Sequence, residues 1–235
     1  MKRTRGFTFV ELLTAIAILS ILVALSAFAL GRATHDARVS GVRFDVVNTL
    51  QFAKDRALAT GRDVYVVFAN LDSTERWPRE NTARVLVYED PDALLRTPAN
   101  LADVMSVVGD AANQQNVLQD LMAGGRVFGD SGLAFVDGEG NPVPGCDADR
   151  IPVYMPVTDT RVDRQSCAAF CTFCDAQPSG CTGAIRFMPD GSARIVTGGP
   201  GTGGLVRLVD PEDARRGACV AISEPNGLAV LIPGT

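Results

Sequence analysis

The feature that most constrains this chain is an apolar segment close to its start. Between Phe7 and Leu30 the only polar side chains are four hydroxyls and one carboxylate, at Thr8, Thr14, Ser20, Ser26 and Glu11. A helix rises about 1.5 Å per residue, so this segment would be about 36 Å long, while the hydrocarbon core of a bilayer is about 30 Å thick. The segment is therefore long enough to cross a membrane as a tilted helix.

The charges in front of this segment predict its orientation. Lys2, Arg3 and Arg5 precede it, and basic flanks stay on the cytoplasmic side of a membrane. A secretory signal peptide also begins with basic residues, but its apolar core usually has only about 7 to 15 residues. We therefore expect a membrane anchor, with the rest of the chain outside the cytoplasm.

Glu11 is the unusual residue of the segment. An ionised side chain costs about 2.5 kcal/mol or more at the centre of a membrane helix and less near its edge. We therefore interpret Glu11 as a functional group that has a partner. The alternative is an ordinary single-span anchor in which the glutamate occurs by chance.

The residues around Glu11 resemble a known signal. Gly6, followed by FTFVEL at residues 7–12 and an unbroken apolar helix, resembles the class III signal of type IV pilins and pseudopilins. The resemblance implies that a prepilin peptidase cuts after Gly6 and methylates the amine of Phe7. It also implies that Glu11 pairs with the N-terminal amine of a neighbouring subunit, and a paired charge is better tolerated in an apolar bundle than a lone one.

The same resemblance implies a location and a set of partners. The chain would be a single-pass inner-membrane protein, with its N-terminus in the cytoplasm and its head in the periplasm, before it enters a pilus or pseudopilus at the cell surface. Its expected partners are the prepilin peptidase, other minor pilins and the major pilin, with a tip adhesin as a further candidate.

The sequence predicts one long helix after the leader. No proline occurs before Pro78, so the helix can run from Phe7 to Thr60, with Gly61 as its C-terminal cap. Apolar residues recur at steps of three and four in its second half, which predicts one apolar stripe, at Val39, Val42, Val46, Leu50, Ala53 and Ala57. The expected divisions are a leader at 1–6, a transmembrane or filament-core helix at 7–30, an amphipathic helix at 31–61 and a β-rich head at 62–235.

Beyond Gly61 the pattern changes to short β-branched runs with turn signals. The expected strands are 64–68, 84–89, 133–136, 184–187, 193–197, 205–209, 218–223 and 228–232. Asn226-Gly227 and Pro189-Asp190-Gly191 predict hairpin turns. Residues 91–124 have no clear period, with a short helix expected at 113–122, and residues 137–183 are expected to form an irregular, cysteine-rich insertion. The predicted fold class is α+β: a pilin-like lollipop in which the helix packs on a mainly antiparallel β head.

The head resembles the GspH/FimT group of pilin-like proteins. The resemblance rests on LQFAKDRALATGRDVYVVF, IRFMPDGSARIV and the closing ACVAISEPNGLAVL. It implies a helix that meets a β-sandwich, in a minor pilin or a minor pseudopilin. Residues from about 88 to 183 depart from the pattern of the group, so nothing is carried over to them.

The cysteines favour disulfides. Six are present, at Cys146, Cys167, Cys171, Cys174, Cys181 and Cys219. An oxidising compartment favours disulfide bonds, and the pairing cannot be read from the sequence. The spacing C-x3-C-x2-C-x6-C leaves a four-thiolate zinc site as an alternative.

No pattern in the chain predicts catalysis. The only histidine is His35, just past the apolar segment, and the glycine-rich residues 198–204 lack the Lys-Ser/Thr of a P-loop. Four acids could bind calcium but more often are simply solvated, at Asp137, Glu139, Asp147 and Asp149. We therefore expect a non-enzyme, without catalytic residues, cofactor or metal.

Three functions remain open at this point. The first is a minor pilin that helps initiate a type IV pilus and sits at or near its tip, and the second is a minor pseudopilin of a type II secretion system. The stapled insertion favours the pilus, because an exposed tip must survive outside the cell. The third, a tip receptor for DNA, is disfavoured by a net charge of −5 and by acids that offset Arg215 and Arg216. No nucleic-acid partner is expected.

Overall fold

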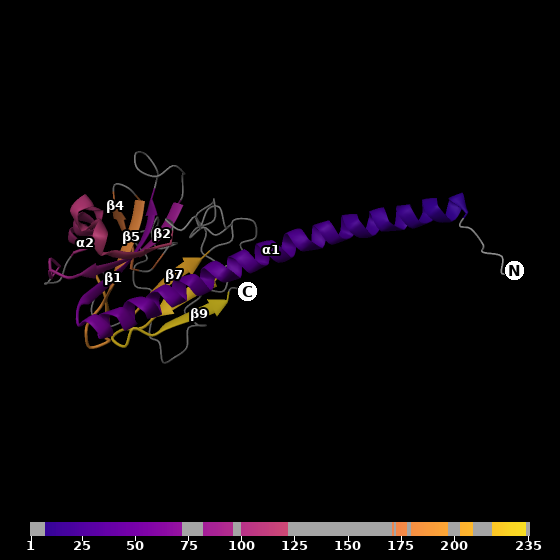
Figure 1. The fold of residues 1–235 in the computed structure, drawn as a ribbon. Coiled ribbons are helices and arrows are strands. Elements are labelled where there is room, and N and C mark those ends of the chain that lie inside the picture. Colours follow the sequence, from indigo (N-terminus) through magenta and orange to yellow (C-terminus); the bar gives the residue numbers. More distant parts are fainter. Residues whose placement is uncertain are drawn as a thin grey trace. The chain divides into compact units, whose positions relative to one another are not determined.

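The computed structural model describes residues 8–71, 82–95, 100–121, 171, 173–177, 180–196, 203–208 and 218–233. The chain divides into two compact units, Met1–Arg38 and Val39–Thr235, each of which is considered by itself. The helices, in chain order and as labelled in Figure 1, are α1 (Phe9–Thr60), α2 (Leu101–Gly109) and the 3-10 helix η1 (Ala111–Asn116). The strands are β1 (Asp63–Leu71), β2 (Thr82–Asp90), β3 (Val117–Asp120), β4 (Asp175–Gln177), β5 (Gly180–Phe187), β6 (Ala193–Ile195), β7 (Gly204–Leu208), β8 (Ala218–Ile222) and β9 (Ala229–Pro233).

The long helix is continuous, as predicted. It has 52 residues and ends at Thr60. Gly61 follows with a φ of 67°, a left-handed conformation that glycine adopts readily, and its N–H donates to the carbonyl of Ala57 at 3.0 Å. The predicted C-terminal cap is therefore confirmed.

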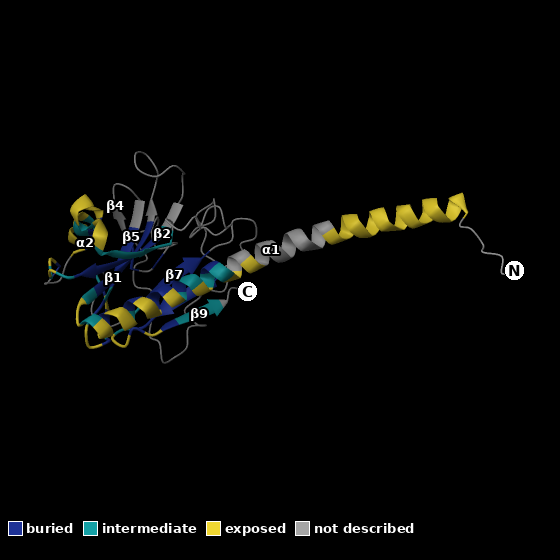
Figure 2. Cartoon of the chain, in the orientation of Figure 1, coloured by how far each residue is buried: buried dark blue, intermediate teal, exposed yellow. Residues whose placement is uncertain are grey.

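The predicted apolar stripe of the helix is buried in the second unit. Its described members are at most 7% exposed, and these are Val42, Val46, Leu50, Ala53 and Ala57. The side chain of Val39 lies outside the described residues. Figure 2 shows buried and exposed residues alternating along this part of α1, which is the pattern of a helix with one face on a core.

A six-stranded antiparallel sheet forms the larger layer of the head. Its strand order is β3-β2-β1-β5-β4, and β6 also pairs with β5. In the central strand, Tyr65 lies between Tyr88 of β2 and Arg186 of β5. Residues 64–69 of β1 are all buried, which explains why VYVVF reads as a nearly continuous apolar run.

A smaller antiparallel sheet, in the order β7-β8-β9, completes the described strands. The turn between β8 and β9 contains Asn226-Gly227, as predicted: Gly227 has a φ of 60°, and its N–H donates to the carbonyl of Ser223 at 2.9 Å. The turn between β5 and β6 is also where the sequence indicates it, with Gly191 at a φ of 80°. The antiparallel character of the head is thus confirmed.

Two apolar clusters occupy the two faces of the six-stranded sheet. The first combines the buried stripe of α1 with side chains from both sheets, including Val66 and Phe68 of β1 and Val206 of β7. The second packs Tyr65 and Tyr88 against α2. Arg56 and Arg62 both pair with Glu89, at 2.8 and 3.1 Å, and so connect the end of α1 and the turn after it to β2.

The helix predicted at 113–122 is wrong. Residues 111–116 form a 3-10 turn, and Val117–Asp120 form β3, which pairs with β2. The α-helix of this region lies earlier, at Leu101–Gly109. Asn100 caps it by accepting the N–H of Asp103 at 2.9 Å, and its buried residues Leu101, Val104 and Val108 have helical spacing.

The C-terminal part of the predicted irregular insertion is regular. β4 and the first residues of β5 lie inside the range 137–183 and pair with each other. The strand expected at 193–197 ends at Ile195, and the strand expected at 133–136 lies outside the described residues.

Candidate functional site

The candidate assembly site is the start of α1, where the sequence places the leader junction and Glu11. Gly6 and Phe7 lie outside the described residues. Thr8 precedes the first helical residue, and its N–H and hydroxyl both donate to Oε2 of Glu11, at 2.8 and 2.9 Å. In return, the N–H of Glu11 donates to the Thr8 hydroxyl at 3.3 Å.

These bonds form a capping box. In this motif a Ser or Thr N-cap and a Glu three residues later satisfy each other's backbone N–H groups, which have no partner inside the helix. The sequence Thr8-Phe9-Val10-Glu11 carries the motif, and the sequence-based interpretation of Glu11 overlooked it. The carboxylate therefore has a partner within its own chain.

The capping box leaves part of the carboxylate available. Oε2 receives both hydrogen bonds from Thr8, whereas Oε1 receives none from the described residues. A carboxylate offers about four acceptor positions. An ammonium group from another chain can therefore approach Oε1, where it would form a charge-assisted hydrogen bond without breaking the cap.

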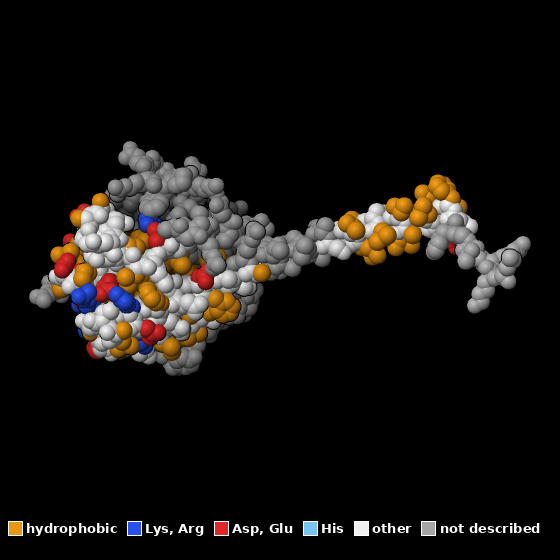
Figure 3. All heavy atoms as spheres, in the orientation of Figure 1, with side chains coloured by type: hydrophobic (Ala, Val, Ile, Leu, Met, Phe, Trp, Pro, Cys, Tyr) orange, Lys and Arg blue, Asp and Glu red, His pale blue; other side chains and the backbone are white. Residues whose placement is uncertain are grey.

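The helix that follows has the length and composition of a membrane span. Among the described helices, the candidate stretch is Phe9–Ser26, with a mean hydropathy of 2.4. Its three hydroxyls donate to carbonyls of the preceding turn: Thr14 to Glu11 at 3.0 Å, Ser20 to Ala17 at 2.8 Å and Ser26 to Leu22 at 2.8 Å. Because each hydroxyl is satisfied within the helix, it adds little cost in an apolar surrounding. Figure 3 shows hydrophobic side chains over this stretch.

The cysteines are only partly described. A disulfide joins Cys171 and Cys174, whose Cα atoms are 5.3 Å apart, and Cys219 is also disulfide-bonded. Cys181 lies in β5, whereas Cys146 and Cys167 are outside the described residues. A sulfur in a disulfide is not the thiolate that zinc binds.

The structure does not describe most of the other sequence candidates. The side chain of His35 and the four acids considered for calcium lie outside the described residues, as does most of the glycine-rich segment 198–204. Within the described part of the chain, no group of three His, Cys, Asp or Glu side chains could hold a metal. On the visible face of the head, basic and acidic side chains lie interspersed (Figure 3).

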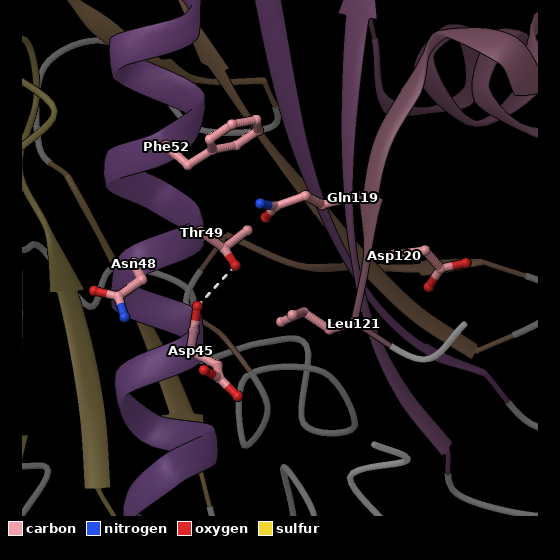
Figure 4. A pocket seen from close by; sticks show the side chains of 7 residues that line it. All are labelled: Asp45, Asn48, Thr49, Phe52, Gln119, Asp120 and Leu121. Carbon is pink, nitrogen blue, oxygen red and sulfur yellow. Dashed lines mark hydrogen bonds between the residues drawn. The ribbon is translucent and has the colours of Figure 1, made fainter. Parts of the chain in front are cut away.

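The head also has a groove between α1 and β3 that the sequence did not indicate. It has a volume of about 360 Å³ and is lined by Asp45, Asn48, Thr49, Phe52, Gln119, Asp120 and Leu121. Figure 4 shows Gln119 and Leu121 turned toward the helix and Asp120 turned away from it. Asp120 pairs with Arg84, and the Thr49 hydroxyl donates to the Asp45 carbonyl at 2.7 Å, so these polar groups already serve the fold.

Comparison with known proteins agrees with the N-terminal geometry. Residues 1–27 match the family described as the prokaryotic N-terminal methylation motif. The chain thus has a prepilin-type methylation motif that leads into an apolar helix, as in a class III prepilin signal, and this supports a pilin or pseudopilin. The motif points to a structural, non-enzymatic subunit that is processed by prepilin peptidase and assembles with other pilins. The comparisons with curated proteins and with solved structures found no match.

Proposed function

We propose that this chain is a minor pilin, which helps to initiate a type IV pilus and sits at or near its tip. The single observation that carries the proposal is the methylation motif at residues 1–27, which leads directly into an apolar helix. The disulfide between Cys171 and Cys174 supports a subunit that works outside the cytoplasm, where disulfides form and persist.

The proposed assembly step acts through Glu11. The prepilin peptidase cuts after Gly6, and the methylated amine of Phe7 becomes the N-terminus of the subunit. Glu11 keeps its capping bonds to Thr8 and presents Oε1 to the amine of a neighbouring subunit. Two charges that are unfavourable alone in an apolar bundle are tolerated when they pair.

The experiment compares wild type, Glu11→Ala and Glu11→Gln in a strain that lacks the native gene. We expect all three forms to be cleaved, inserted and folded, because the hydrogen bonds of this carboxylate in the described structure are to Thr8, at the start of the same helix. Both variants should be depleted from purified filaments, and filament number should fall if the subunit initiates assembly. Gln retains size and hydrogen bonding but has no charge, so it should behave like Ala if an ion pair is required.

Two outcomes would contradict the proposal. Normal incorporation of Glu11→Ala would remove the assembly role and leave the glutamate as part of the peptidase signal. Normal pili together with a loss of protein secretion in the deletion strain would assign the subunit to a type II secretion pseudopilus instead.

A further inference from the structure

The turn between Cys171 and Cys174 is part of the core of the head. The N–H of Cys174 donates to the carbonyl of Cys171 at 3.3 Å, and a disulfide closes the turn. Cys171, Phe173 and Cys174 are 0%, 2% and 2% exposed. These residues of the expected irregular insertion are therefore part of the buried core.

This turn contacts both sheets. Cys171 forms an isolated antiparallel bridge with Val206 of β7, in the smaller sheet. The ring of Phe173 packs edge-to-face on Phe68 of β1, in the larger sheet, with centroids 5.9 Å apart and planes at 76°. The disulfide turn thus lies where the two sheets share one apolar cluster.

The described strands β5 and β7 pack closely against the turn at two positions. A Cβ added at Gly183 of β5 would lie 2.7 Å from Cδ2 of Phe173 and 2.8 Å from Sγ of Cys174. A Cβ added at Gly204 of β7 would lie 2.4 Å from Cδ1 of Phe173. Bonded sulfurs are about 2.05 Å apart, whereas unbonded atoms need about 3.5 Å or more. Two free thiols would therefore need room that the strands packed on Phe173 and Cys174 do not leave, and overpacking destabilises a core.

We propose that oxidation of Cys171 and Cys174 must precede the docking of the two sheets. The buried sulfurs cannot be reached once β5 and β7 have closed over Phe173, so the bond has to form in an open head. The supply of an oxidant rests on the proposed function, because it requires the head to be exported from the cytoplasm. The order of events rests only on the packing.

The reaction is a thiol–disulfide exchange with a disulfide-bearing oxidase outside the cytoplasm. The thiolate of one cysteine attacks the disulfide of the oxidase and forms a mixed disulfide. The second thiolate then attacks the bonded sulfur of the first, so the Cys171–Cys174 bond forms and the oxidase leaves as a dithiol. Two electrons pass to the oxidase, and the two protons from the thiols balance its new thiols. A head that has not been exported remains open.

The first test uses the full chain, purified in detergent and oxidised. It is incubated with dithiothreitol in native buffer or in urea, and free thiols are alkylated and identified by peptide mass spectrometry. We expect Cys171 and Cys174 to be reduced about 100-fold or more slowly in native buffer, because reduction requires the head to open. Equally fast reduction, with amide protection retained in β5 and β7, would overturn the proposal.

The second test follows refolding. The reduced, urea-unfolded chain is diluted into detergent buffer with or without oxidised glutathione, and hydrogen exchange reports protection in β5 and β7. We expect wild type to recover this protection only with the oxidant. The control is Cys171→Ala/Cys174→Ala, which removes both sulfurs, retains the other cysteines and should lose the oxidant dependence at β7.

Two results would refute the order of events. One is full protection of β5 and β7 in the reduced wild-type chain. The other is the same oxidant dependence in the double alanine variant, which would assign the requirement to another pair, such as the one that includes Cys219. Neither test uses filament assembly, so the proposed function can fail without affecting them.

Discussion

Gly204→Ala tests whether Phe173 is fixed between the two sheets. The new Cβ would lie 2.4 Å from Cδ1 of Phe173 and 2.7 Å from Cδ1 of Ile195, whereas carbon atoms pack best at about 3.5–4.0 Å. Gly204 does not have a positive φ, so alanine meets no backbone strain there. Overpacking should lower the free energy of unfolding by about 1–3 kcal/mol. Alanine loses less conformational entropy on folding than glycine does, and this offsets part of the loss. We expect a net loss of about 1–2 kcal/mol in the free energy of unfolding.

The assay is urea denaturation of the full chain in detergent under oxidising conditions, followed by circular dichroism. Gly41→Ala is the matched control, because a Cβ at Gly41 in α1 meets nothing within 4 Å. It should stabilise the helix by about 0.5–1 kcal/mol. The same glycine-to-alanine change should thus have opposite signs at the two positions.

A double-mutant cycle identifies the residue responsible for the clash. Phe173→Leu removes the ring atoms that the new methyl group would meet, so Gly204→Ala should cost less in the Leu background, with a coupling of about 0.5–2 kcal/mol. If Gly204→Ala is as stable as wild type, or if its effect and that of Phe173→Leu are additive, then the ring of Phe173 does not pack against Gly204.

Three further predictions concern the N-terminus and the sheet. Gly6→Leu should block cleavage, because the peptidase requires a small residue before the cut; mass spectrometry should find the full-length chain, and an unchanged mature mass starting at Phe7 would contradict the class III signal. Thr8→Val should weaken the helix start by about 0.5–2 kcal/mol and speed amide exchange at Glu11, whereas Thr8→Ser should not; equal exchange rates would rule out the capping box. Burial raises the pKa of Tyr65 above its usual value of about 10, so its contribution to stability is present below that pH and is lost as the pH rises. Tyr65→Phe should cost about 0.5–1.5 kcal/mol at pH 7 through loss of the 3.0 Å bond to the Leu95 carbonyl, and should reduce the alkaline fall in stability; an unchanged slope above pH 10 would show that Tyr65 does not titrate there.

The methylation motif, the apolar helix and the capping box at the N-terminus can all be read from the sequence. The apolar run, Glu11 and the Thr-x-x-Glu spacing all lie within a few helical turns, so their interactions follow from helix geometry alone. The overlooked capping box was legible in the sequence. The position of Glu11 in an apolar segment points to a partner in another subunit, whereas the spacing to Thr8 points to a partner three residues earlier in its own helix.

The region 91–124 shows where local patterns compete. Asn100 and the spacing of Leu101, Val104 and Val108 indicate the helix that the structure contains. Residues 113–120 could also form a helix by composition. Their conformation is decided by β2, which offers an open edge to Val117–Asp120, and edge pairing overrides a weak local preference.

The sequence by itself determined the N-terminal unit, the end of the long helix and the two glycine turns, because these features depend on side-chain spacing and backbone freedom within a few residues. Only the tertiary structure decided the place of Phe173. The ring of Phe173 packs beside Phe68, Gly183 and Gly204, which lie on three strands far apart in the chain. A sequence pattern cannot predict the space that two glycines on separate strands leave for a ring. That space exists only when both sheets pack on one core.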